Sequence, residues 1–155
     1  MKTSLIGSKR KPFSQAIHDQ NDPKARQVIM QFVRQRGLTT KENPDIYGID
    51  LFISGTVATG RVYDNMPIEV ERRECWSAEY FPFATIHIPE RKTKFFKTNI
   101  LYAIVNKHYD KFMFCLSNNI IKHELQEVLN KYVKQGEYFY DVPLKEWKVY
   151  NLEGG

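Results

Sequence analysis

Apolar residues recur along this chain at two spacings, which predict one helix followed by a series of strands. The helix is expected to begin after Asp22, because an acid at the N-cap followed by Pro23 at the first helical position is a favoured start. Four apolar residues then recur at helical spacing: Val28, Ile29, Phe32 and Val33. Gly37 is expected to end the helix, since glycine readily adopts the left-handed conformation found just past many helices.

Beyond this helix, apolar residues come in the short runs and alternations that are typical of strands. The polar stretch 39–45 predicts a turn, and 54–67 predicts a connector with further turns. Strands are predicted at 47–53, 68–71, 84–88, 100–105, 112–116, 120–128, 138–142 and 147–152. The basic segment 90–97 predicts a helical turn or short helix, and the strands on either side of 106–110 predict a hairpin. The C-terminal part is therefore expected to be rich in strands.

Length and composition predict one folded domain with a basic arm before it. The chain has 155 residues, of which 42% are hydrophobic and 14% aromatic, and this composition excludes general disorder. Residues 1–20 carry Lys9, Arg10 and Lys11 with little apolar periodicity, so we interpret them as an arm and 21–155 as a single domain. The formal net charge of +5 favours nucleic acid as a partner.

The remaining bulk features predict a cytoplasmic protein. Cys75 and Cys115 are too few and too far apart for a zinc site or a disulfide framework, which indicates a reducing, intracellular setting. The basic amino terminus lacks the apolar segment of a signal peptide. No apolar run approaches the roughly 20 residues of a membrane helix, so no membrane contact is expected.

Three acids on two neighbouring predicted strands are the strongest candidates for chemistry. Asp50 lies in an otherwise apolar run, where an unpaired carboxylate is costly. Glu69 and Glu71 alternate with Ile68 and Val70, so the two acids share one face of their strand. A cation between these three carboxylates would balance their charge, and Mg²⁺ prefers oxygen ligands of this kind. The alternative is ordinary, because Glu-x-Glu on a strand is by itself usually a solvated face.

The Asp on one strand and the Glu-x-Glu on the next, after a capped helix, resemble the PD-(D/E)XK nuclease superfamily. The resemblance covers roughly residues 22–117 and implies a restriction-endonuclease-like α/β fold, with a mixed central sheet flanked by helices. It also implies hydrolysis of phosphodiester bonds, above all in DNA, with Mg²⁺ or Mn²⁺ as cofactor. By this resemblance Asp50 and Glu69 would hold the metal ion. Asp50 is preferred to the literal Pro44-Asp45 pair because Asp50 is expected within a strand and Asp45 in a turn.

One position departs from the family pattern, because Glu71 stands where the family has lysine. Glu71 is predicted to bind a second metal ion or to act as general base. The missing positive charge would then come from Arg72, Arg73 or Lys92. The competing explanation is loss of catalysis, which leaves a nucleic-acid-binding protein without cleavage, or a structural or assembly protein.

A basic segment follows the acidic strands and is the candidate contact for substrate. Arg91, Lys92 and Lys94 are predicted to bind backbone phosphates, together with Arg72 and Arg73. The alternative for the segment 90–97 is a solvated face over a phenylalanine anchor. His87 is expected to be a structural histidine at a sheet edge. Many enzymes of this fold form dimers to cut two strands, so a homodimer is also an option. The sequence leaves open whether the substrate is DNA or RNA, and whether cleavage is endo- or exonucleolytic.

Overall fold

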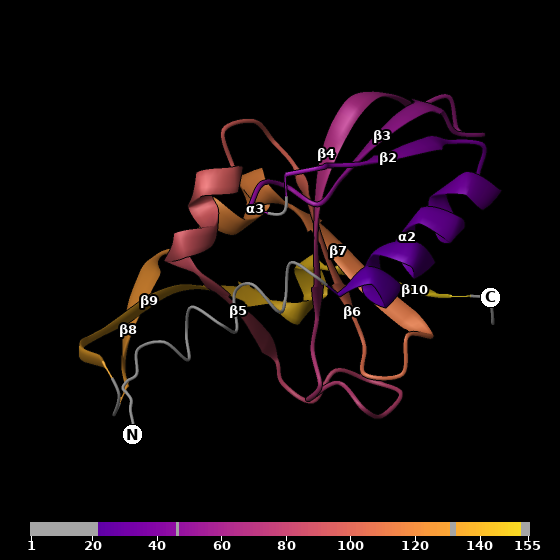
Figure 1. Cartoon of the computed structure of the whole chain (residues 1–155). Coiled ribbons are helices and arrows are strands. Elements are labelled where there is room, and N and C mark those ends of the chain that lie inside the picture. Colours follow the sequence, from indigo (N-terminus) through magenta and orange to yellow (C-terminus); the bar gives the residue numbers. More distant parts are fainter. Residues whose placement is uncertain (1–21, 46, 131–132, 153–155) are drawn as a thin grey trace.

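The computed structural model describes residues 22–45, 47–130 and 133–152, which form two sheets (Figure 1). The large sheet has six strands in the order β10-β7-β6-β4-β3-β2, and neighbours are antiparallel except β4 and β6, which are parallel. The small sheet is antiparallel, in the order β5-β9-β8. The strands are β2 (Thr39–Glu42), β3 (Leu51–Thr56), β4 (Val62–Arg72), β5 (Thr85–Pro89), β6 (Leu101–Val105), β7 (Lys111–Leu116), β8 (Leu125–Asn130), β9 (Val133–Pro143) and β10 (Lys148–Asn151). The helices are α2 (Pro23–Gln35), α3 (Ser117–Ile121) and the 3₁₀ turns η1 (Glu90–Phe95) and η2 (Leu144–Glu146).

Helix α2 begins and ends as its sequence predicts. The carboxylate of Asp22 accepts a hydrogen bond from the Ala25 backbone N–H at 3.1 Å, which satisfies one of the free donors of the first turn. Gly37 has a φ of +87°, in the left-handed region that glycine adopts without strain. The buried face of the helix, which includes Ile29 and Phe32, packs on one face of the large sheet.

The central strands of the large sheet are buried on both faces, and each face has its own core. Along β6 all five residues are buried, which suits a central strand covered on both sides. Alternate side chains of β6 enter different cores: Leu101 and Ala103 lie on the α2 side, and Tyr102 and Ile104 on the other. The second core also receives residues of β5, α3 and the end of β9, so the small sheet and α3 cover the face opposite α2 (Figure 1).

The connection between the parallel strands β4 and β6 determines what lies near the acidic residues. Parallel neighbours cannot be joined by a tight turn, so the chain must cross over between them. Here the crossover runs through β5 and η1, on the face opposite α2. Glu69 and Glu71 point to that same face, because Ile68 and Val70 point into the α2 core. The basic turn η1 is thereby brought to the acidic side of β4.

Several predicted boundaries are wrong. The stretch 39–45 contains the edge strand β2, whose four residues are mostly exposed, and a solvent-facing edge strand has no need of apolar residues. The connector 54–67 is mainly strand, because β3 runs to Thr56 and β4 already begins at Val62. The strand predicted at 47–53 begins only at Leu51, after a turn at Tyr47 and Gly48. The stretch predicted as strand 120–128 begins in α3, and β8 starts at Leu125.

The coarse fold class is confirmed as mixed α/β, with strands dominating the C-terminal part. The predicted hairpin is also present, formed by β6 and β7, and the basic segment is a short 3₁₀ helix. The predicted arm, 1–20, lies outside the described residues. In the part of the chain that the structure describes, no helix is long and apolar enough to cross a membrane.

Candidate functional site

Asp50 and Glu69 meet at the start of the β3–β4 hairpin. Leu51 of β3 pairs with Ile68 of β4, so the next residue outward on each strand is Asp50 or Glu69. Asp50 lies just before β3, so the expectation that it lies within a strand is wrong. Its Oδ2 accepts a hydrogen bond from the Val70 backbone N–H at 2.8 Å, and its carboxyl group also hydrogen-bonds the carboxyl group of Glu69.

A lysine from the crossover completes this cluster. Lys92 lies on η1 and its Nζ donates a hydrogen bond to Glu69 Oε2 at 3.0 Å. Both side chains are buried, with exposed fractions of 6% for Lys92 and 1% for Glu69. A buried lysine is rare unless it is paired, and here the partner is one of the two acids. We name Asp50, Glu69 and Lys92 the acid–lysine cluster.

The two buried carboxyl groups of this cluster have a single lysine to balance their charge. The pKa of Asp50 is raised to about 8, chiefly by burial and next by the neighbouring Glu69 carboxylate, whereas the Val70 N–H and Lys92 oppose this rise. Burial also raises the pKa of Glu69, although Lys92 opposes this effect. With its pKa near 8, Asp50 keeps its proton at neutral pH. Glu69 Oε1 is buried and has no ordinary hydrogen-bond donor among the described residues.

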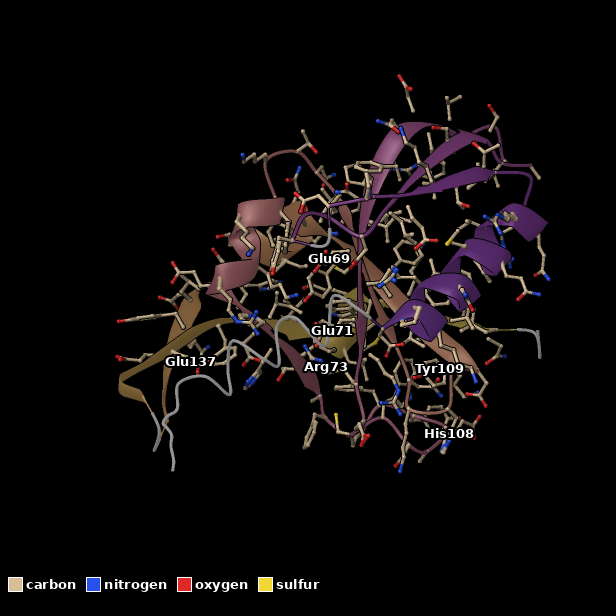
Figure 2. The ribbon with its side chains drawn as sticks, viewed as in Figure 1. Glu69, Glu71, Arg73, His108, Tyr109 and Glu137 are labelled. Atoms are coloured by element: carbon tan, nitrogen blue, oxygen red, sulfur yellow. The ribbon has the colours of Figure 1, made fainter. Side chains whose placement is uncertain are left out.

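Glu71 lies next to this cluster but has its own partners. Its Oε2 pairs with the guanidinium of Arg73, and its Oε1 accepts a hydrogen bond from the Tyr102 hydroxyl at 2.5 Å. Burial alone would raise the pKa of Glu71, but the Arg73 charge and these hydrogen bonds lower it below its ordinary value. Arg73 also donates to the His87 carbonyl at 2.9 Å. Figure 2 shows Glu69 and Glu71 of β4, and Arg73 just past its end, one below the other.

The predicted site residues thus separate into groups. Asp50, Glu69 and Lys92 are in contact, and Glu71 with Arg73 forms the adjoining ion pair. Arg72 points elsewhere: its guanidinium donates to the Lys107 carbonyl at 2.9 Å and lies over the Tyr109 ring, at the β6–β7 turn. The two remaining predicted cations lie on the exposed side of η1, namely Arg91 and Lys94.

Sequence reasoning missed Tyr102 and treated His87 as structural. Tyr102 is fully buried and interrupts an otherwise aliphatic strand, and that interruption is the only sequence signal for its hydroxyl contact with Glu71. His87 lies on the edge strand β5, with its Nε2 at 3.2 Å from Asp141 on β9. Its side chain is 51% exposed.

The donor set suits a hard divalent cation with few protein ligands. Within the described ranges, no group of three or more His, Cys, Asp or Glu side chains is arranged to hold a metal ion. Asp50 and Glu69 nevertheless bring carboxylate oxygens together, and Glu69 Oε1 is buried without a donor. Mg²⁺ is commonly bound by one or two carboxylates, with water and phosphate oxygens as the other ligands. The two acids therefore fit such an ion.

Comparison with protein-family models, with curated proteins and with solved structures gave no match. A function has to be inferred from the chemistry of the site.

Proposed function

We propose that this chain is a Mg²⁺-dependent nuclease that hydrolyses phosphodiester bonds, with DNA as its substrate. The observation that carries the proposal is the acid–lysine cluster: two carboxyl groups in contact, with a lysine Nζ at 3.0 Å from one of them. Strongly perturbed pKa values cluster at functional sites, and two buried carboxyl groups beside a lysine are such a combination. A capped helix followed by Asp50 and Glu69 on neighbouring elements also agrees with the resemblance to the PD-(D/E)XK superfamily and supports a restriction-endonuclease-like core.

Asp50 and Glu69 would hold the metal ion. A bound Mg²⁺ or Mn²⁺ supplies charge that polarises a phosphoryl oxygen and favours deprotonation of water. Asp50 is oriented for this role by the hydrogen bond from the Val70 N–H, which fixes one of its oxygens. Glu69 is held by Lys92, so the cation and the lysine would share the same carboxylate.

Lys92 is the residue that would replace the lysine missing from position 71. It comes from η1, 23 residues after Glu69. An ammonium group beside the scissile phosphate would orient the attacking water and offset the negative charge that develops in the transition state. The separation in sequence does not matter for this role, because the crossover between β4 and β6 brings η1 to the acidic face.

Glu71 has a different role in this proposal from the one its sequence position suggests. Both of its oxygens accept hydrogen bonds, from Arg73 and Tyr102, so in this conformation neither is directed at a metal ion. It would instead hold Arg73 in place beside the cluster, where a guanidinium can contact a phosphate oxygen. Arg91 and Lys94 are exposed on η1 and would contact phosphates farther along the substrate.

A second function is favoured by one observation. Lys92 already compensates the charge of Glu69, and the Glu69 side chain is only 1% exposed. A protein that binds nucleic acid without cleaving it would keep such a pair for stability alone. This alternative predicts binding that is independent of Mg²⁺ and unchanged when the two acids are neutralised.

Cleavage assays separate these two functions. The full chain is incubated with DNA and with RNA in Mg²⁺, Mn²⁺ or EDTA, and the products are resolved by length. We expect cleavage in either metal and none in EDTA, and loss of at least 100-fold in rate for Asp50→Asn and for Glu69→Gln. Asp64→Asn is the matched control, because Asp64 is an exposed carboxylate on the same strand as Glu69. Absence of cleavage with every substrate, or full activity in both variants, would refute the proposal.

A further inference from the structure

Among the residues that the structure describes, α2 covers only part of its face of the large sheet. The helix has 13 residues, which corresponds to about 20 Å at 1.5 Å per residue. The six strands span about 24 Å across at 4.8 Å between neighbours, so one helix cannot cover the whole face. Figure 1 shows α2 lying over one part of the large sheet, with the small sheet on the other side. The uncovered part forms a groove.

This groove is large and mostly apolar. It has a volume of about 790 Å³, within the range of roughly 300 to 1,000 Å³ that is usual for small-molecule sites. Its wall on the helix side includes Phe32, and its floor includes Ala103, whose short side chain leaves room above the sheet. Phe114 and Tyr150 stack in parallel at 5.7 Å, and both stay half-buried beside the groove.

The charges of the groove are all of one sign. Arg36, Arg61 and Lys148 line it, and none of the described lining residues is acidic. No carboxylate of the described residues lies within ion-pairing distance of these three cations. Arg36 and Arg61 instead lie over aromatic rings, those of Phe32 and Tyr63. Their charges are therefore available to an anion.

We propose that this groove binds a small anion with a large apolar body, such as a medium-chain fatty acid. Apolar side chains would bury the body, and the rim cations would bind the acidic group. Charge complementarity selects this occupant over two others. Residues 1–21 have four cations and one acid, so the chain's own arm repeats the sign of the rim. A second copy would bring the same three cations and a net charge of +5 against the first.

Calorimetric titration of the full chain with dodecanoate, below its micelle-forming concentration, tests this inference. We expect saturable binding of dodecanoate, and binding at least tenfold weaker for dodecyl maltoside and for dodecyltrimethylammonium, which have the same tail with a neutral or a cationic head. The double variant Arg36→Glu/Arg61→Glu should bind dodecanoate at least tenfold more weakly. Lys41→Glu/Lys97→Glu is the matched control, because both lysines are exposed and neither lines the groove.

A third variant tests the apolar body of the site. Leu116→Gln places a polar group in the lining and should weaken dodecanoate and dodecyl maltoside alike. Melting temperatures confirm that each variant is folded. No saturable binding in the full chain would overturn the proposal, as would equal affinity for all three head groups. A dimer that dissociates in the Arg36→Glu/Arg61→Glu variant would also overturn it, by assigning the groove to a second copy. These outcomes do not depend on nuclease activity, since the groove lies on the face of the sheet opposite the acid–lysine cluster.

Discussion

Asp50 and Glu69 are two buried acids with one lysine beside them. Burial disfavours their charged forms, so ionisation of these groups opposes folding. The pKa of Asp50 rises from 3.8 to about 8, chiefly because burial disfavours the carboxylate and next because Glu69 is beside it. Between these two values the folded protein holds a proton that the unfolded chain has lost. The contribution of Asp50 to the free energy of unfolding is therefore fully present below about pH 4 and is lost as the pH rises toward 8.

Asp50→Asn should stabilise the protein in EDTA, and more at pH 8 than at pH 5. Asparagine keeps the acceptor for the Val70 N–H but has no charge to bury. The measurement is the melting temperature of wild type and variant across this pH range. Asp64→Asn, an exposed acid of the same strand as Glu69, is the control and should show no such pH-dependent gain. A constant difference between Asp50→Asn and wild type at every pH would contradict the assigned pKa.

Lys92→Met should destabilise the protein by about 3 to 5 kcal/mol, because removal of one partner leaves the other charge buried without compensation. Urea denaturation at pH 7 measures the loss in the free energy of unfolding. Adding Glu69→Gln to Lys92→Met should recover most of it, since the double variant has no ion pair left to break. Lys94→Met is the matched control on the exposed side of the same turn. Equal losses in Lys92→Met and in the double variant would show that Lys92 stabilises by packing alone.

Sequence reasoning came close to this cluster but could not complete it. The apolar run around Asp50 marks this acid in the sequence, and the alternation with Ile68 and Val70 marks Glu69. Lys92 was one of three candidates for the missing charge, and nothing local distinguishes it from Arg72 and Arg73. The choice depends on the path of the crossover, which places η1 against β4 while Arg72 turns toward Lys107.

At the scale of elements, η1 presents two kinds of cation. Lys92 is buried in the acid–lysine cluster, whereas Arg91 and Lys94 face solvent. A short 3₁₀ turn has about three residues per turn, so neighbouring side chains point in different directions. This geometry divides the basic segment into one buried residue of the cluster and two exposed cations.

Arg91→Ala/Lys94→Ala should weaken nucleic-acid binding and reduce its salt dependence. Removing one phosphate-binding cation lowers the slope of log affinity against log salt by roughly 0.9 for duplex DNA, so the double variant should reduce the slope by about 1.8. Fluorescence anisotropy in EDTA, over several salt concentrations, measures the slope apart from cleavage. Lys41→Ala/Lys145→Ala removes the same charge from exposed positions on other elements and should change the slope less. Equal slopes in both double variants would mean that η1 makes no special contact.

Elements with strong local signals were predicted well, and those set by tertiary context were not. α2 was predicted because Asp22 and Gly37 mark its ends chemically. For the edge strand β2 the sequence predicts a turn, because its exposed, polar residues carry no apolar alternation. The long β3–β4 hairpin was shortened because its outer half, around Val62 and Asp64, lies beyond the core and is exposed.

At the scale of the whole molecule, the two faces of the large sheet have different chemistry. The α2 side carries an apolar core and the cationic groove, and the other side carries the second core and the acid–lysine cluster. The alternation of β4 produces this division, since Ile68 and Val70 face one way and Glu69 and Glu71 the other. Sequence predicts the alternation, but the partners on each face come from segments distant in the chain.

If Mg²⁺ binds at Asp50 and Glu69, it should raise the free energy of unfolding of the whole molecule by an amount that depends on pH. A cation that binds only the folded protein stabilises it by RT ln(1 + [Mg²⁺]/Kd), and protons compete with it for the shared carboxyl groups. We expect 10 mM Mg²⁺ to raise the melting temperature more at pH 8 than at pH 5, because the proton held by Asp50 is lost near pH 8. NaCl of equal ionic strength controls for screening, and Glu69→Gln should remove the effect at both pH values. A rise that is equal at pH 5 and pH 8, or that persists in Glu69→Gln, would place the ion elsewhere on the protein.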